Sequence, residues 1–295
     1  MKTPVFRGAM TALATPFDPA GRVDYTAYEK LIDRQLALGC GGLAVCATTG
    51  EGSTLEEREF SDLVECAVSR VGRRVPVAVG AGGNNTRHAL ALCLEARRLG
   101  ADALLLVTPY YNKTTQRGLI EHYTYLADRS GLPILLYNVP SRTGMRIEPE
   151  TCAVLAQHPM ICGIKEAGGD FSSMVKMKAL CPPEFVLYSG NDDQVLPILA
   201  LGGLGVISTV GNLIPREMSD LCTRWENGDH AGALALQTQI KPLVDALFCA
   251  VNPVPLKAAL EDLGLCCGTL RLPLCPLDGT QREKLRAALR DYGLL

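Results

Sequence analysis

Residues 104–107 read LLLV and residues 134–137 read ILLY, two short apolar runs without polar alternation. A strand with one solvated face alternates apolar and polar residues, whereas a parallel strand covered on both faces reads as a continuous apolar run. The two runs therefore predict buried parallel strands of an α/β protein.

Similar apolar segments recur along the chain at intervals that leave room for a helix. The helical patterns between them have one polar and one apolar face, and they cover residues 25–38, 55–71, 86–99 and 116–129. Eight βα repeats predict a closed (β/α)8 barrel, the TIM barrel, and an open doubly wound sheet is the alternative that the spacing does not exclude. The eight segments lie near residues 9–13, 43–46, 75–79, 103–107, 134–137, 162–165, 185–188 and 205–208.

After the eighth segment, the sequence changes character. From about residue 213 onward it predicts helices and no further strand, with one helix opening at residues 252–255 and another near Thr280. We therefore expect a catalytic barrel over residues 1–228 and a small helical domain over residues 229–295. No low-complexity tract marks a flexible linker between them, so a tight boundary is expected.

Charge and composition favour small-molecule partners. Lys and Arg number 29 against 31 Asp and Glu, so no strong positive field attracts nucleic acid or an anionic membrane. The longest uncharged stretch, residues 194–215, contains four glycines and is interpreted as barrel core rather than a membrane span. Residues 1–7 lack the apolar region of a secretory signal, so a cytoplasmic location is expected.

The cysteines and histidines do not form a metal-binding pattern. No Cys-x-x-Cys pair occurs, and the four histidines lack ligand spacing, so no protein-bound metal is expected. Proton transfer near neutral pH then falls to Tyr, Lys or a carboxylate. Several of the twelve cysteines are predicted to pack as small apolar side chains, without a disulfide framework. These are Cys40, Cys46, Cys93, Cys152, Cys162 and Cys249.

Lys165 ends the sixth predicted strand, directly after an apolar run. In a TIM barrel the active site lies at the C-terminal ends of the strands. Burial there disfavours the ammonium form and lowers the pKa of a lysine, which leaves a nucleophilic amine able to form a Schiff base. A lysine that only extends from a strand end to solvent is the alternative interpretation.

Three other strand ends on the same predicted rim carry unusual residues. Residues 47–52 (ATTGEG) follow the second strand, residues 108–113 (TPYYNK) the fourth, and residues 137–144 begin with Tyr137 and include Arg142. A guanidinium in such a loop can bind a carboxylate, and only one of two successive tyrosines can face a given pocket. The structural alternatives are a turn with Thr54 as helix N-cap, packing tyrosines and a surface arginine.

Across nearly the whole chain, these motifs resemble the dihydrodipicolinate synthase family, within the class I pyruvate-aldolase superfamily that includes N-acetylneuraminate lyase. The motifs occur in the family's order and spacing. They are TTGE (48–51), PYYNK (109–113), YNVPSRTG (137–144), GIKEA (163–167), SG (189–190), GVIS (205–208) and NPVPLK (252–257).

The resemblance implies a lyase of the lysine (diaminopimelate) biosynthesis route. Lys165 would form a Schiff base with pyruvate, and the enamine would attack L-aspartate 4-semialdehyde to give 4-hydroxy-tetrahydrodipicolinate. No cofactor beyond this covalent Schiff base is implied. The resemblance also implies a homotetramer built as a dimer of dimers.

The same resemblance assigns roles to individual residues. Thr48, Tyr137 and Tyr111 would form a hydroxyl relay, with Tyr111 contributed by a neighbouring subunit. A relay suits the chemistry, because a phenol with a pKa near 10 is a poor base at neutral pH. The implied substrate-binding residues are Thr49, Arg142, Gly190 and Ile207.

A regulatory site for lysine is implied at a subunit interface. His88 stands where an acidic residue is common, and a neutral imidazole does not pair with an ammonium as a carboxylate does. Phe60 likewise replaces a polar side chain, so we expect weak or absent inhibition by lysine. The implied site comprises Gly52, Ser53, Glu57, Phe60, Asn84, His88 and Tyr110.

Two other functions remain open at this point. A pyruvate-releasing aldolase acting on N-acetylneuraminate or a 2-keto-3-deoxy sugar acid is the alternative within the superfamily, although the loop around Arg142 and the double threonine favour the synthase. The alternative from another class is a non-catalytic barrel that only binds ligands.

Overall fold

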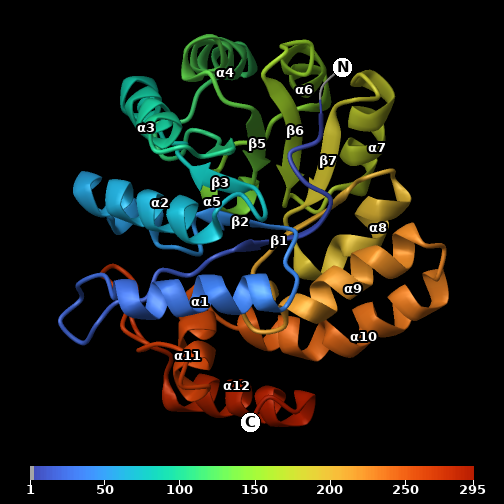
Figure 1. Cartoon of the computed structure of the whole chain (residues 1–295). Coiled ribbons are helices and arrows are strands. Elements are labelled where there is room, and N and C mark those ends of the chain that lie inside the picture. Colours follow the sequence, from blue (N-terminus) through green and yellow to red (C-terminus); the bar gives the residue numbers. More distant parts are fainter. Residues whose placement is uncertain (1–2) are drawn as a thin grey trace.

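The computed structural model describes residues 3–295. Met1 and Lys2 lie outside the described residues, and they are the first two residues of the segment 1–7 that was assessed for a secretory signal. Eight parallel strands in this range close into a barrel in sequence order, with β1 paired to β8 (Figure 1). The predicted barrel is confirmed and the open sheet is wrong. The strands are β1 (Gly8–Ala12), β2 (Gly42–Val45), β3 (Val77–Gly80), β4 (Ala103–Val107), β5 (Ile134–Asn138), β6 (Ile161–Glu166), β7 (Val186–Ser189) and β8 (Gly205–Ser208).

Helices surround the barrel and continue beyond it (Figure 1). The four predicted helices correspond to α1–α4, with shifted ends. The helices are α1 (Tyr25–Ala37), α2 (Glu57–Val71), α3 (Thr86–Arg98), α4 (Gln116–Ser130), α5 (Pro140–Thr143), α6 (Pro149–Leu155), α7 (Phe171–Leu180), α8 (Val195–Ala200), α9 (Pro215–Glu226), α10 (His230–Leu247), α11 (Val254–Asp262) and α12 (Gly279–Tyr292), with short 3-10 turns η1 (Gly52–Thr54), η2 (Asp192–Gln194) and η3 (Val210–Asn212).

Each strand contributes to two cores, which explains the apolar runs. On β5, Leu135 and Tyr137 belong to the cluster inside the barrel, whereas Ile134 and Leu136 pack in the larger cluster that includes helix residues. Both faces are therefore buried, as expected for a parallel strand covered on both sides. The third strand starts at Val77 rather than residue 75, because Pro76 has no N–H for the sheet ladder.

The C-terminal helices begin with α10, whose N-cap is Asp229. Helix α10 contacts α9, α11 and α12, and Figure 1 shows α11 and α12 below α1. A helical C-terminal part is therefore confirmed, while the division between residues 228 and 229 stays a prediction. No helix in residues 3–295 combines the length and apolar character needed to cross a membrane.

Cys249 corrects the prediction that it packs as a small apolar side chain. Its side chain is exposed, because α10 ends at Leu247 and the following segment lies at the surface. The other five cysteines predicted to be buried are buried.

A buried ion pair joins the C-terminal helices to the loop after β2. The amine of Lys257 on α11 donates to Glu51 Oε1 at 2.6 Å, and the two side chains are 0% and 1% exposed. The same amine lies 4.0 Å from the centre of the Phe17 ring. A buried ion pair offsets its loss of hydration only when its geometry is good and its charges have further favourable contacts. Here the Phe17 ring provides such a contact for the Lys257 amine.

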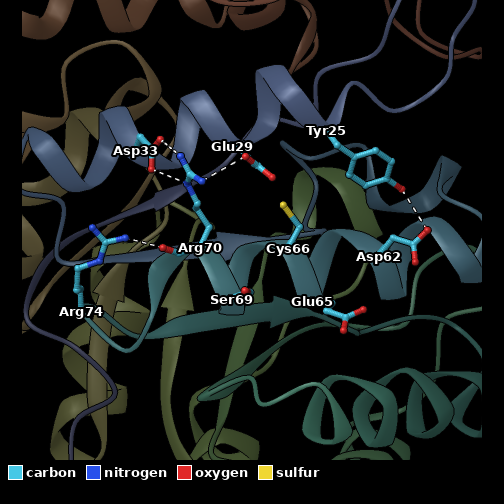
Figure 2. Close-up of a pocket in the computed structure, with 9 residues that line it drawn as sticks. All are labelled: Tyr25, Glu29, Asp33, Asp62, Glu65, Cys66, Ser69, Arg70 and Arg74. Carbon is cyan, nitrogen blue, oxygen red and sulfur yellow. Dashed lines mark hydrogen bonds and ion pairs between the residues drawn. The ribbon is translucent and has the colours of Figure 1, made fainter.

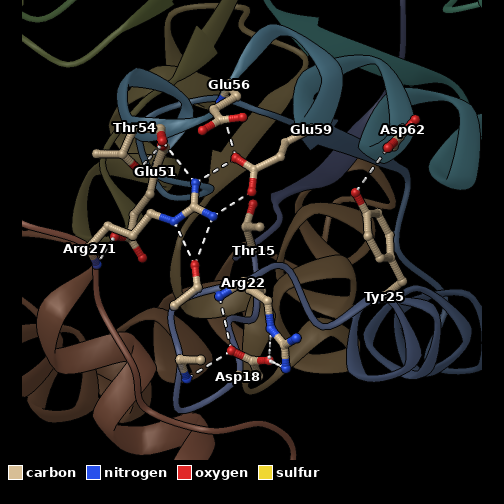
Figure 3. Close-up of polar contacts among 12 residues, drawn as sticks. Thr15, Asp18, Arg22, Tyr25, Glu51, Thr54, Glu56, Glu59, Asp62 and Arg271 are labelled. Carbon is tan, nitrogen blue, oxygen red and sulfur yellow. Dashed lines mark hydrogen bonds and ion pairs between the residues drawn. The ribbon is translucent and has the colours of Figure 1, made fainter.

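Arg271 reinforces this connection through its whole guanidinium (Figure 3). Its side chain donates to the carbonyls of Gly21 and Thr54, each at 2.9 Å, and forms a bidentate pair with Glu59. Its backbone N–H donates to Glu51 Oε2 at 3.1 Å. The C-terminal segment therefore holds the loop between β2 and α2 at its middle and at the first turn of α2.

We expect Lys257→Met to lower the free energy of unfolding by about 3–5 kcal/mol, because it leaves the Glu51 carboxylate buried without its cation. Urea unfolding at fixed protein concentration, followed by circular dichroism, measures the change. The double variant Glu51→Gln/Lys257→Met removes both charges and should recover most of the loss. Equal destabilisation of the single and double variants would contradict the proposed cost of the unpaired charge.

Candidate active site

Lys165 lies near the C-terminal end of β6, on the rim formed by the ends of the strands. Its side chain is 5% exposed, and its amine lies 4.4 Å from the centre of the Tyr137 ring. Tyr137 and Lys165 are paired in the register of β5 and β6, so adjacent inward positions bring them together. Burial lowers the pKa of Lys165 to about 8, while Asp192 acts to raise it and Arg142 to lower it. Burial thus increases the share of neutral, nucleophilic amine near neutral pH.

Tyr137 links Lys165 to the loop after β2. Its hydroxyl is hydrogen-bonded to the Thr48 side chain. Burial raises the pKa of Tyr137, and the charge of Arg142 together with the Thr48 hydrogen bond opposes this rise. A phenol held in this way passes a proton more readily to a linked hydroxyl than it acts alone as a base.

Asn252 connects two of the predicted substrate-binding residues. Its side-chain amide donates to the Thr49 hydroxyl at 3.0 Å, and its backbone carbonyl accepts from Arg142 Nη2 at 3.3 Å. Thr49 is buried, whereas Arg142 on α5 is exposed. Asn252, a residue of the C-terminal part, therefore positions both the buried Thr49 hydroxyl and the exposed Arg142 guanidinium.

The loop after β2 has an unusual backbone. Cys46 and Glu51 have φ of 55° and 51°, a region that residues with a Cβ rarely occupy. At Gly52, a Cβ would lie 2.1 Å from the Cys46 carbonyl oxygen, so only glycine fits this turn. Helix α2 is capped by Glu56 in a capping box, so the alternative interpretation of Thr54 as N-cap is wrong.

A cavity of about 450 Å³ opens above this loop, and Thr48, Tyr137 and Arg142 line it. The predicted regulatory residues line the same cavity. His88 is exposed there, whereas Phe60 is 4% exposed and packs in the core. Lys165 does not line the cavity itself, but its amine contacts the Tyr137 ring, which does. The regulatory residues are Gly52, Ser53, Glu57, Phe60, Asn84, His88 and Tyr110.

The two successive tyrosines separate as the alternation predicts. Tyr110 lines the cavity, while Tyr111 has φ of 66° and is 91% exposed. Within one chain, the Tyr137 and Thr48 side chains therefore lie together, whereas the Tyr111 side chain is exposed to solvent.

Gly190 and Ile207 lie on neighbouring strand ends. A Cβ at Gly190 would lie 2.7 Å from the Ala167 Cβ, so the strand ends approach too closely for another residue. Ile207 is fully buried in the cluster inside the barrel, together with Tyr137.

Three polar residues of the site were not among the predicted site residues. Asp192 follows β7 and is 2% exposed, Glu166 follows Lys165 directly, and Asn252 opens the NPVPLK motif. Glu166 accepts from the Asn138 side chain at 2.8 Å and from the Gly168 N–H at 2.6 Å. The sequence signal for Asp192 is its place in the turn after β7. The signal for Glu166 and Asn252 is their place within the motifs GIKEA and NPVPLK.

A second hollow of about 850 Å³ lies outside the barrel between α1 and α2 (Figure 2). It contains no residue of the site around Lys165, and within it Arg70 forms ion pairs with Asp33 and Glu29. Within residues 3–295, no group of three His, Cys, Asp or Glu side chains is arranged to hold a metal ion.

Residues 5–292 match the profile of the dihydrodipicolinate synthetase family. The 4-hydroxy-tetrahydrodipicolinate synthase of Alkaliphilus oremlandii is 47% identical to this chain, covering 99% of it and 100% of the relative. The crystal structure of dihydrodipicolinate synthase from Thermotoga maritima is 42% identical with a TM-score of 0.97, covering 99% and 100%. A monomeric dihydrodipicolinate synthase variant is 42% identical with a TM-score of 0.96, covering 99% and 98%. This chain belongs to the dihydrodipicolinate synthetase family.

Proposed function

We propose that this enzyme condenses pyruvate with L-aspartate 4-semialdehyde to give 4-hydroxy-tetrahydrodipicolinate, the first committed step of the diaminopimelate route to lysine. The observation that carries the proposal is the buried Lys165 amine, with a pKa lowered to about 8, against the Tyr137 ring. The named relatives, which match over nearly the whole chain, support the same reaction.

In the proposed mechanism, the neutral Lys165 amine attacks the ketone carbon of pyruvate. A C–N bond forms, the former carbonyl oxygen leaves as water, and loss of a methyl proton gives the enamine. The enamine carbon then attacks the aldehyde carbon, whose oxygen takes up a proton, and the lysine nitrogen becomes an iminium again. The amino group of the former semialdehyde adds to the iminium carbon and closes the ring. The bond to the Lys165 nitrogen then breaks, which releases the cyclic imine product and the free amine. Tyr137 and Thr48, already hydrogen-bonded to each other, relay these protons.

We assign the two substrate carboxylates to different residues. Thr49, held by Asn252, together with Gly190 and the Ile207 backbone, would hold pyruvate beside Lys165. Arg142, exposed on the wall of the cavity, would bind a carboxylate of the semialdehyde through its guanidinium.

We also propose that the enzyme is a cytoplasmic homotetramer, a dimer of dimers, in which Tyr111 completes the relay of a neighbouring subunit. The 91% exposure and left-handed backbone of Tyr111 support this role, because they direct a large aromatic ring away from its own chain. We retain a division into residues 1–228 and 229–295 as the domain organisation.

The other two functions considered from sequence are less well supported. The relatives are named as synthases, which disfavours a pyruvate-releasing aldolase. A barrel that only binds ligands gives no role to a buried amine with a lowered pKa.

We expect borohydride with pyruvate to add stable mass at Lys165, because reduction traps only the Schiff base. Since the free amine is the nucleophile, the trapping rate should rise about tenfold per pH unit up to about pH 8 and then level off. Peptide mass spectrometry across pH 6–9 measures both site and rate. The exposed control Lys176→Met should be trapped normally, and Lys165→Met should not; no adduct in the unsubstituted enzyme would refute Schiff-base chemistry.

Arg142→Ala should raise KM for aspartate semialdehyde at least tenfold while changing KM for pyruvate much less, because a hydrogen bond to a charged group contributes about 1.5–3 kcal/mol. Steady-state kinetics with a coupled reductase measures both constants. Arg146→Ala is the matched control, since Arg146 pairs with Asp170 instead of lining the cavity. Equal effects of Arg142→Ala on both substrates would refute the division of labour.

Lysine should inhibit weakly or not at all, because His88 offers no carboxylate to the ligand's ammonium group. The same coupled assay, with lysine added, measures the inhibition constant. His88→Glu supplies the missing carboxylate and should increase sensitivity to lysine. A submillimolar inhibition constant for the unsubstituted enzyme would overturn this expectation.

A further inference from the structure

One buried carboxylate near Lys165 has no role in the chemistry described so far. Asp192 follows β7 at the start of η2 and is 2% exposed. Its Oδ1 is buried and has no hydrogen-bond partner among the described residues. Leaving a carboxylate oxygen unpaired in the interior costs free energy, so a residue that keeps one there needs a compensating interaction.

The other half of the Asp192 side chain is rigidly held. Oδ2 accepts from the backbone N–H groups of Thr209 and Val210 at 3.0 and 2.9 Å. The Asp192 carbonyl accepts from the Gln237 side chain at 2.9 Å. The two N–H bonds fix the carboxylate from the segment after β8, and the Gln237 bond fixes the Asp192 backbone from α10, so Oδ1 keeps a constant direction.

Lys165 lies on β6, which pairs with β7, so Lys165 and Asp192 come from neighbouring strand ends of the same rim. Burial raises the pKa of Asp192, and the charge of Lys165 opposes this rise. The two act on each other, and Asp192 opposes the loss of charge that burial imposes on the amine. The remaining groups that face the amine are Arg142 on α5, which repels its charge, and the Tyr137 ring on β5. Glu166 is occupied by Asn138 and Gly168. Asp192 is therefore the carboxylate placed to balance the cation.

We propose that Asp192 is a positioning residue whose fixed carboxylate holds the positive charge of Lys165, first as the ammonium and then as the protonated Schiff base with pyruvate. The inference rests on the proposed function. When the C=N bond forms and water leaves, the nitrogen becomes cationic inside a low-dielectric barrel. A nearby fixed negative charge stabilises this cation without reorganisation during the reaction.

The test compares Asp192→Asn with the unsubstituted enzyme in the borohydride trapping assay with pyruvate across pH 6–9. Asparagine keeps the shape and an oxygen for the Thr209 and Val210 N–H groups but removes the charge. Without that charge the ammonium is less favoured, so the midpoint of the trapping profile should move from about 8 to lower pH, by about one unit. The fraction trapped at saturating pyruvate should also fall.

Two control variants separate charge from structure. Asp192→Glu retains the charge and should keep the midpoint near that of the unsubstituted enzyme. Asp193→Asn removes a charge from the exposed neighbouring position and should not move it. If Asp192→Asn does not fold, as judged by a thermal melt, Asp192→Ser removes the same charge and should give the same shift.

The outcomes also separate this inference from the proposed function. Absence of trapping in the unsubstituted enzyme at every pH would refute Schiff-base chemistry itself. A different outcome would overturn the role of Asp192 alone. In that outcome the unsubstituted enzyme is trapped normally, and Asp192→Asn keeps the same midpoint in its pH profile, even if its trapping rate falls.

Discussion

The desolvation of one amine inside a closed barrel is the constraint around which this active site is built. Closure leaves each strand with an inward face that must be filled by side chains, and most of these are apolar, such as Leu135 and Ile207. Lys165 is an exception, and its charge must be balanced there or lost. The Tyr137 ring and the guanidinium of Arg142 act on this balance from the end of β5, and the carboxylate of Asp192 acts on it from the end of β7.

The same constraint explains why the loops are held so firmly. A proton relay and a buried amine work only at fixed distances, whereas loops at a barrel rim are intrinsically mobile. The loop that carries Thr48 and Thr49 includes strained backbone at Cys46 and Glu51. Strain of this kind persists only where surrounding contacts enforce it, and Lys257 together with Arg271 provides them.

The barrel and the position of Lys165 could be predicted from sequence because both depend on local patterns. Apolar runs mark strands covered on both sides, and a residue directly after such a run falls on the rim. Asp192 and Asn252 were missed as site residues because their importance comes from contacts across the fold. Asn252 reaches Thr49 over 203 positions, a relation that no local pattern contains. The intersubunit role of Tyr111 comes from family resemblance, and one chain does not test it.

The contacts of Asn252 have a consequence for how this architecture can be modified. Through its amide and its carbonyl, this residue of the C-terminal part contacts Thr49 and Arg142. The barrel is therefore not a self-contained module to which the last helices are merely appended. A chimera that exchanges the C-terminal segment between family members would also exchange the residue that contacts Thr49 and Arg142. Recombination at that boundary would therefore change contacts at the barrel rim as well as the packing of the helices.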